Sequence, residues 1–526
     1  MKIRRPHPVL TATLSGALVL GVLAGCSTAA TESTSGTSTT TTTTTSDVAS
    51  TVSDALVGNE DYTALAALAD ETWDTSTETT VSLDGDSAAV SGDGATADGS
   101  TVTITAPGTY RISGTLDDGQ VVVSSEADGV VRLVLDGADI TSSTGSAIAV
   151  TQADDVSVVL ADGSSNNLTD ATTYADTGED APNAALFSSD AMVISGTGSL
   201  NVTGRSNDGI ASKDGLVIAD GDITVTAVDD GVRGKDYLVL TGGTVDVDAE
   251  GDGLKADNED GTNEDGETVG YAALLGGEVT VASGDDGVHA ESELVVDGAA
   301  VTVSEAVEGL EAAHILVAGG TVDVTSSDDG FNAAGGTSTT SDEAATSDAT
   351  DEAPTEAEAP QGGGMPGEAA GDFSLVITGG DVTVDAGGDG LDSNGTLTVS
   401  GGDVTVFGPT SAGNGTLDSA GALTVDGGTL LAIGTSSMLQ TPGDGSEGWV
   451  AATFDTLSAG TELTVVDASG TAVATVTLAK DTQSVVLASP DVTAGEEYTI
   501  QAGGADVATV TAGEAPASTG MGGGRP

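Results

Sequence analysis

The sequence predicts an all-β fold, a right-handed parallel β-helix: a single-stranded solenoid with about 22 residues and three short strands in each coil. An acidic residue followed by glycine recurs at intervals of about 22 residues, as in the first two steps (230 − 208 and 252 − 230), apart from two longer intervals. Short runs of Val, Ile, Leu and Thr between these turns are typical of strands. Glycine is abundant (76 of 526 residues) and aromatic residues make up 2% of the chain, which favours thin stacked coils over a thick core.

Two turn markers define each coil. The first is an acidic residue before a glycine and an apolar residue, at Asp208, Asp230, Asp252, Asp286, Glu308, Asp329 and Asp389. The second is usually Gly-Gly-x-Val-x-Val, with its second glycine at Gly243, Gly277, Gly320, Gly380 and Gly402, and with Gly221 and Gly298 in the same register. A third apolar run lies between the markers, as at residues 238–240, so each period contains three strands. Two longer intervals contain insertions, an acidic loop at residues 257–269 and a low-complexity segment at residues 335–371 that is predicted to be disordered.

The remaining segments are assigned by where this period begins and ends. From residue 449 the runs become longer and alternate, which predicts antiparallel strands that cover the open end of the solenoid. A short helix is expected at residues 61–70. The predicted segments are a lipoprotein signal peptide (1–25), a Thr/Ser-rich linker (26–58), an N-terminal cap region (59–98), the parallel β-helix (99–448), a small C-terminal antiparallel β cap (449–511) and a Gly-rich tail (512–526).

The N-terminus has the pattern of a secretion signal. Lys2, Arg4 and Arg5 precede an apolar stretch at residues 14–23 that is too short to span a bilayer comfortably. The stretch ends in Leu-Ala-Gly-Cys, which resembles the lipobox of bacterial lipoproteins, and Cys26 is the single cysteine of the chain. We expect lipidation of Cys26 and attachment to the extracytoplasmic face of the cell membrane. The alternative is an ordinary cleaved signal with an incidental cysteine.

The charge of the chain restricts its partners. With 83 acidic and 12 basic residues the formal net charge is −71, which argues against nucleic acid and favours cations. The glycines lie at turns and form no phosphate-binding loop or dinucleotide fingerprint. His289 and His314 match no catalytic triad or zinc motif. We therefore predict no catalytic residues, and we expect a monomer.

The acidic residues of successive coils are expected to stack about 4.8 Å apart, the spacing of neighbouring strands. Like charges at that distance repel by about 1 kcal/mol in water and by several times more in a less polar setting. A divalent cation between two rungs would relieve the repulsion, because calcium binds carboxylate oxygens at about 2.3–2.6 Å. We predict Ca²⁺ as cofactor at Asp208, Asp229, Asp230, Asp252, Asp285 and Asp286. The alternative is that Asp-Gly is a favourable turn with a solvated face.

Basic residues gather near the same turns. Alternation along the first strand of each coil predicts one outward row, formed by Ala211, Arg233, Lys255, His289, Glu311, Asn332 and Asp392. The predicted carbohydrate-binding residues are Arg205, Lys213, Arg233, Lys235 and Lys255. They would pair with anionic groups such as the carboxylates of uronates, with calcium as a bridge. The alternative is local charge balance against the acidic residues.

Several stretches together resemble a family of secreted bacterial β-helix proteins that bind carbohydrate and are related in fold to pectate-type polysaccharide lyases. The matching pieces are "GTYRISGTLDDGQVVV", "VRLVLDGADIT", "NAALFSSDAMVISGTGSLNV", "NDGIASKDGLVI", "DDGVRGKDYLVLTGGTVDV", "GDGLKADN" and "QSVVLASPDVTAGEEYTI". The resemblance covers most of residues 80–510 and implies binding of cellulose and acidic plant polysaccharides with bound calcium. The chain departs from that family in its long acidic insertions and in its lack of aromatic platforms for stacking on cellulose.

Two rival functions remain open. The first is a calcium-dependent lyase in which Lys213, Lys235 or Lys255 abstracts a proton from a uronate. A neutral lysine base needs a lowered pKa, and an acid-rich setting is expected to raise it, which disfavours the enzyme. The second is a structural spacer or adhesin stiffened by calcium.

Overall fold

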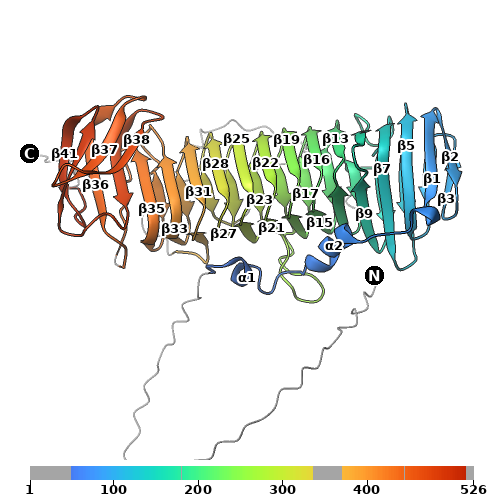
Figure 1. Ribbon diagram of the computed structural model, residues 1–526, viewed down its shortest axis with the longest axis horizontal. Helices are drawn as coiled ribbons and strands as arrows, with labels where there is room; N and C mark the ends of the chain where they lie inside the picture. The colour runs from blue at the N-terminus through green and yellow to red at the C-terminus, as the bar shows by residue number, and fades with distance from the viewer. Residues whose placement is uncertain (1–48, 179–180, 336–369, 444, 517–526) are drawn as a thin grey trace, which may run out of the picture. The chain divides into compact units, whose positions relative to one another are not determined.

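The computed structural model describes residues 49–178, 181–335, 370–443 and 445–516 (Figure 1). These residues contain 41 strands and four short helical segments. In the repeated region a strand pairs in parallel with the strand three places later, as β14 (Asp208–Ser212) does with β17 (Val232–Gly234). The predicted three strands per repeat are therefore present, and the chain is nearly all β with long parallel sheets. No helix among the described residues is long and apolar enough to cross a membrane.

The three strands of each coil form three ladders along the chain. The first-strand ladder is a separate sheet and contains β3 (Ala95–Asp98), β4 (Thr101–Ile104), β6 (Gln120–Ser124), β8 (Ile148–Gln152), β11 (Ala184–Ser188), β14, β17, β20 (Leu254–Ala256), β23 (Val288–Ala290), β26 (Leu310–Ala312), β29 (Phe331–Ala333), β32 (Leu391–Ser393) and β34 (Leu417–Ser419). The second-strand ladder contains β9 (Asp155–Leu160), β12 (Met192–Gly196), β15 (Gly215–Ile218), β18 (Tyr237–Leu240), β21 (Tyr271–Leu274), β24 (Glu293–Val296), β27 (His314–Val317) and β30 (Ser374–Ile377).

The third-strand ladder contains β10 (Ser165–Thr169), β13 (Ser199–Gly204), β16 (Asp222–Ala227), β19 (Thr244–Ala249), β22 (Glu278–Ser283), β25 (Ala300–Glu305), β28 (Thr321–Ser326) and β31 (Asp381–Ala386). Longer strands continue the stacking at both ends: β1 (Thr79–Gly85), β5 (Gly108–Leu116) and β7 (Val130–Thr141) before it, and β33 (Thr396–Phe407) and β35 (Leu423–Gly434) after it. A hairpin partner, β2 (Ser87–Ser91), pairs antiparallel with β1.

Each turn marker has its own steric reason. In β19 exposed and buried residues alternate, and Val247 points into the core. A Cβ atom on Gly231 would overlap the Cγ1 of Val247, so the residue after the acid must be glycine because of close packing. The second marker depends on backbone conformation instead: Gly243 has a φ of 84°, which an L side chain rarely adopts.

The N-terminal part of the described chain lies along the outside of the second-strand ladder (Figure 1). It contains α1 (Val52–Ala55), α2 (Thr63–Ala67), η1 (Leu68–Asp70) and η2 (Thr75–Thr77). Leu65 packs with the outward Val217 and Val239, and the hydroxyl of Tyr271 donates to the carbonyl oxygen of Glu60 at 2.7 Å. The helix expected at residues 61–70 is confirmed. Part of the predicted linker also packs on the coils, through Ala49, Val52 and Leu56.

β1, within the region predicted as the N-terminal cap, pairs in parallel with β5, so parallel stacking begins near residue 79. At the other end, β39 (Thr482–Ala488) pairs antiparallel with both β35 and β36 (Trp449–Leu457). β37 (Glu462–Asp467), β38 (Ala472–Thr477), β40 (Glu497–Ala502) and β41 (Ala505–Thr511) form a four-stranded antiparallel sheet. The predicted lipidation residue Cys26 and residues 336–369 of the predicted insertion lie outside the described residues.

Candidate functional site

The middle residues of the first strands form one continuous row, which we call the charged ladder. The parallel pairing aligns Ala211, Arg233, Lys255, His289, Glu311, Asn332, Asp392 and Asp418 on successive coils. The predicted row is therefore correct in register. The prediction that this row faces solvent is wrong for two of its members, because His289 is 2% exposed and Glu311 is 8% exposed. Long side chains on rungs about 4.8 Å apart cover one another and pair with the acidic residues beside them.

The acidic residues before the glycines form a second row, the acid ladder, which is buried at Asp208, Asp230, Asp252 and Asp286 and partly exposed further along. Asp230 is 5% exposed and Asp252 is 3% exposed. The backbone N–H of Asp252 donates to Asp230 Oδ1 at 3.0 Å, and the N–H of Asp286 donates to Asp252 Oδ1 at 2.9 Å. One carboxylate oxygen on each of these rungs therefore accepts a hydrogen bond from the next coil, which makes the acid part of the coil stacking.

Arg233 and Lys255 balance part of this charge inside the molecule. Lys255 Nζ lies 2.8 Å from Asp252 Oδ2 and 3.2 Å from Asp230 Oδ2. Arg233 makes a fork to Asp257 with distances of 2.8 Å from Nε to Oδ1 and 2.6 Å from Nη2 to Oδ2, and its Nη1 is 3.8 Å from Asp208. These contacts are the local charge balance that the sequence left open as an alternative.

The other three predicted carbohydrate-binding residues lie on the same stretch of the chain but differ in exposure. Arg205 is exposed, and its backbone N–H donates to Asp170 at 2.6 Å. Burial and the neighbouring Arg233 lower the pKa of Lys213. The pKa of Lys255 is raised, because the Asp230 and Asp252 carboxylates outweigh the opposing effect of burial. The expected direction was therefore right for Lys255 and wrong for Lys213.

His289 is surrounded by carboxylates, which sequence analysis missed. Its Nδ1 lies 3.2 Å from Asp286 Oδ2 and 2.9 Å from Glu311 Oε2, and its Nε2 lies 3.6 Å from Glu291 Oε1. Burial alone would lower the pKa of His289, but the hydrogen bonds to the three carboxylates raise it to about 12. One feature of the sequence could have indicated the contact with Glu311: it lies 22 residues after His289 (311 − 289), which places the two residues on adjacent rungs.

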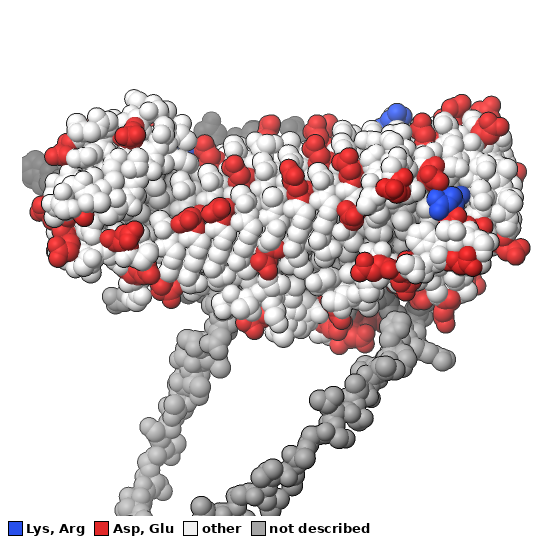
Figure 2. All heavy atoms as spheres, viewed as in Figure 1, with Lys and Arg blue, Asp and Glu red and all other residues white. Residues whose placement is uncertain are grey.

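The C-terminal half of the two ladders contains acids without basic partners. The sequence has no lysine or arginine between Lys255 and Lys480. Burial, followed by repulsion from neighbouring acids, raises the pKa of Glu308 to about 7 and that of Asp329 to about 8. The same causes raise the pKa of Asp389 to about 6 and that of Asp392 to about 7. Figure 2 agrees in its view: acidic side chains spread along the row of coils, and Lys and Arg appear at few places.

Several groups of side chains could hold a metal ion. Ligand atoms of Asp208, Asp229 and Asp230 lie within 4.8 Å of one another, and this all-oxygen set fits calcium. The same is true of Asp286, Glu308 and Glu311. Ligand atoms of Asp252, Asp286 and His289 form a third group of this kind. Of the six predicted calcium ligands, Asp285 belongs to no such group among the described residues.

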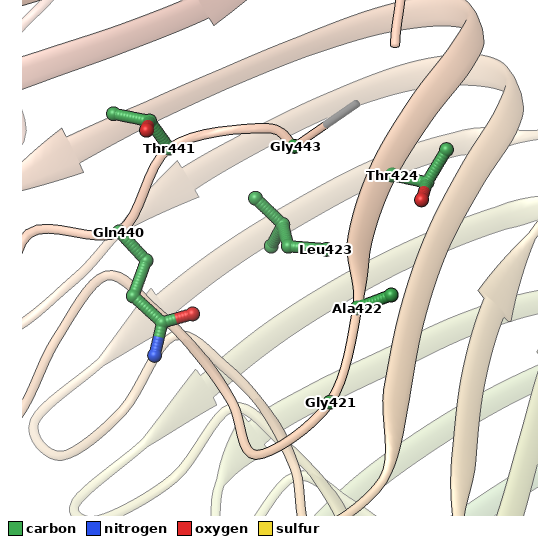
Figure 3. A pocket seen from close by; sticks show the side chains of 7 residues that line it. All are labelled: Gly421, Ala422, Leu423, Thr424, Gln440, Thr441 and Gly443. Carbon is green, nitrogen blue, oxygen red and sulfur yellow. The ribbon is translucent and has the colours of Figure 1, made fainter. Parts of the chain in front are cut away.

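A fourth group, Glu60, Asp214 and Asp236, joins the N-terminal segment to two coils. Sequence analysis missed it because Glu60 is remote in the chain from the other two. Figure 3 shows a cavity of about 440 Å³ near the C-terminal end of the ladders, lined by Gly421, Ala422, Leu423, Thr424, Gln440, Thr441 and Gly443. Gln440 Nε2 donates to Asp418 Oδ1 at 2.6 Å beside it. None of the predicted site residues lines this cavity.

Comparisons with known proteins identify related chains. A family model described as "Carbohydrate-binding domain-containing protein" matches residues 98–352 and 304–415. A curated protein of that description from Acetivibrio thermocellus is 42% identical over 128 residues, which are 24% of this chain and 45% of the relative. The matched region thus spans less than half of that relative. A solved structure, the polysaccharide lyase-like protein from C. thermocellum as a gadolinium derivative, has 34% sequence identity and a TM-score of 0.41, covering 43% of this chain and 91% of the other.

Proposed function

Because the chain belongs to the family of carbohydrate-binding domain-containing proteins, we propose that it binds acidic polysaccharide in a calcium-dependent way on the face formed by the first-strand ladder. We further propose that it acts at the cell surface as a lipoprotein anchored through Cys26. The coils would wind right-handed, and strands β36–β41 would protect the last coil from pairing with other chains.

The observation that carries the proposal is the excess of buried carboxylate over basic side chains along the two ladders. Asp208 is 1% exposed, and its pKa is raised by burial and then by Asp230. Buried carboxylates are costly unless they are protonated, paired or bound to a cation. When bound, calcium would supply positive charge at Asp208, Asp229 and Asp230 and leave coordination positions for a carboxylate of the ligand.

The basic residues that remain for the ligand are Arg205, Lys213 and Lys235. Arg233 and Lys255 already contact aspartates, so they hold the acid ladder in place and contribute positive potential. Lys213 and Lys235 follow the first strand on adjacent coils, since the N–H of Lys235 donates to the carbonyl of Ser212. Two ammonium groups at this spacing can pair with consecutive carboxylates of a uronate chain.

Retention of glycans tests the proposal. The chain from residue 27 onward is immobilised, and polygalacturonate and cellulose are passed over it with Ca²⁺ or with a chelator. We expect polygalacturonate to be retained with Ca²⁺ and to lose at least about tenfold in affinity with the chelator. Lys213→Ala and Lys235→Ala should each weaken retention several-fold, because each removes a charge-assisted contact worth about 1 kcal/mol. Lys480→Ala, in the connection between β38 and β39, is the control for loss of a lysine elsewhere and should have no effect.

A second candidate function is a polysaccharide lyase, favoured by the lowered pKa of Lys213. A lysine with a lowered pKa is neutral in a larger fraction of molecules at a given pH and can act as a base. Its Nζ would take the C5 proton of a uronate, and the electron pair would expel the glycosidic oxygen to leave an unsaturated sugar. Ultraviolet absorbance of the unsaturated product, present in the unmodified chain and lost in Lys213→Ala, would establish this activity. Retention without any product would exclude it.

A third candidate, a spacer or adhesin stiffened by calcium, predicts a different result. Ca²⁺ would then raise the melting temperature while no glycan is retained.

A further inference from the structure

We propose that Asp252, Asp286 and His289 form a binding site for a first-row transition-metal ion, with Zn²⁺ as the probe ion, and that Glu311 completes it. The site shares Asp286 and Glu311 with one of the all-oxygen groups that fit calcium, but it differs from them in chemistry because His289 supplies a nitrogen ligand. It shares the acid ladder with the proposed calcium sites but does not depend on carbohydrate binding.

The distances are close to those of a coordination shell. Ligand atoms of Asp252, Asp286 and His289 all lie within 4.8 Å of one another. His289 Nδ1 is 3.2 Å from Asp286 Oδ2 and 2.9 Å from Glu311 Oε2. A tetrahedral zinc ion with bonds of about 2.0–2.1 Å places its ligand atoms about 3.3 Å apart. A shift of a few tenths of an ångström would bring His289 Nδ1 to this spacing from Asp286 and Glu311. Asp252, whose ligand atom lies within 4.8 Å of the other two, would move by up to about 1.5 Å to join them.

The residues around the ligands hold them in the required orientation. Ligating histidines commonly donate their second ring nitrogen to a carboxylate, which sets the ring orientation and the tautomer. His289 Nε2 lies 3.6 Å from Glu291 Oε1, so a small movement of the Glu291 side chain would give this arrangement. Asp252 is held by the N–H of Asp286 on Oδ1 and by Lys255 on Oδ2. Each carboxylate oxygen has two lone pairs, so these contacts leave positions for a metal.

Burial and charge favour a dication here. Asp252, Asp286 and His289 are each less than 5% exposed, so water screens them little. Four carboxylates, those of Asp252, Asp286, Glu291 and Glu311, surround two basic groups, Lys255 and His289. Replacing the imidazole proton by a dication would bring the cluster closer to neutrality. Imidazole favours Zn²⁺ and its neighbours over Ca²⁺, which prefers oxygen ligands.

The test is metal titration of the chain from residue 27 onward after dialysis against a chelator. Isothermal titration with Zn²⁺ and the visible absorption of bound Co²⁺ report the ion and its nitrogen ligand without any glycan. We expect one Zn²⁺ with a micromolar or tighter affinity, weakened about 100-fold or more in His289→Gln. His314→Gln is the matched control, because His314 contacts Ser374 Oγ at 3.0 Å on another ladder and should leave the affinity unchanged. Unchanged Zn²⁺ affinity in His289→Gln, or no binding by the unmodified chain, would overturn the proposal.

A second variant covers the case in which His289→Gln does not fold. Glu291→Gln changes a partly exposed residue that orients the ring, and a loss of about 10-fold in Zn²⁺ affinity is expected. No change in Zn²⁺ affinity in this variant would count against the assigned ring orientation and the site. Failure of the zinc site can be distinguished from failure of the proposed function. Asp229→Asn should reduce calcium-dependent glycan retention, whereas its Zn²⁺ affinity should stay within about twofold of that of the unmodified chain.

Discussion

Arg233 holds Asp257 through a two-pronged contact, with Nε–Oδ1 at 2.8 Å and Nη2–Oδ2 at 2.6 Å. Asp257 directly follows β20 and is the first residue of the acidic insertion at residues 257–269, whereas Arg233 lies on the preceding coil. The pair therefore joins two coils and fixes the start of the loop. Both side chains are 18% exposed, which places the pair between a surface salt bridge and a buried one.

Asp257→Asn should destabilise the protein by about 1–3 kcal/mol, because it leaves a mostly buried guanidinium with a weaker partner. Urea unfolding followed by circular dichroism measures the change. Asp260→Asn, on an exposed residue of the same loop, is the control and should change stability by less than about 0.5 kcal/mol. Equal effects of the two substitutions would mean that the fork contributes nothing specific.

Gly231→Ala should destabilise the coil by about 1–3 kcal/mol through overpacking, since the new methyl group would overlap Val247 Cγ1. Combining it with Val247→Ala removes that overlap but not the close approach to the carbonyl oxygen of Gly253 at 2.6 Å, so the double variant should lose less than the sum of the two single losses but should not recover fully. Differential scanning calorimetry of the four proteins gives the coupling. Strict additivity would show that the inward packing is not the reason for the glycine.

Without calcium, the stability should fall as the pH rises from about 5 to 8. The pKa values of Glu308, Asp329, Asp389 and Asp392 are raised in the folded chain to about 7, 8, 6 and 7. The folded state then binds more protons than the unfolded state in this window, so the slope of unfolding free energy against pH is negative. Each unit of pKa shift corresponds to at most about 1.4 kcal/mol, reduced by solvent screening.

The measurement is the melting temperature in a chelating buffer at pH 5.5 and at pH 8, with a drop of about 5 °C or more expected. Adding Ca²⁺ should recover most of the drop at pH 8 if the ion binds these acids. A melting temperature that rises with pH in the chelating buffer would contradict the stated direction of the pKa shifts.

Leu65→Ala should loosen the N-terminal segment without unfolding the coils. Leu65 is 4% exposed and packs on the outward face of the second-strand ladder, whereas the core of the coils is a separate apolar cluster. Hydrogen exchange of residues 49–70 should increase by at least about tenfold while β18 stays protected. Val57→Ala, on an exposed side chain of the same segment, is the control. Faster exchange throughout the coils would show that the segment is part of the main folding unit.

Much of the fold could be predicted from the order of the residues. The repeat of Asp-Gly and Gly-Gly markers predicted three strands per coil, and simple alternation predicted which residues share the charged ladder. Both predictions rest on local geometry: strands have a side-chain period of two, and a constant coil length keeps the register. The parallel pairing of β1 with β5 near residue 79 was not predicted, because the Asp-Gly pairs there, at residues 84–85 and 118–119, are followed by polar residues and do not match the marker.

Burial and contact across coils could not be predicted in this way. The alternation placed Arg233, Lys255 and His289 on the outward side of their strands, but exposure depends on the side chains of the coils above and below. The sequence by itself determined the register of the charged ladder and its excess of acid. Only the tertiary structure decided that His289 and Glu311 of the ladder are buried, that Lys255 is paired with two aspartates, and that His289 lies among carboxylates. Most of those contacts join residues about one coil apart, and no local pattern specifies the directions of their side chains.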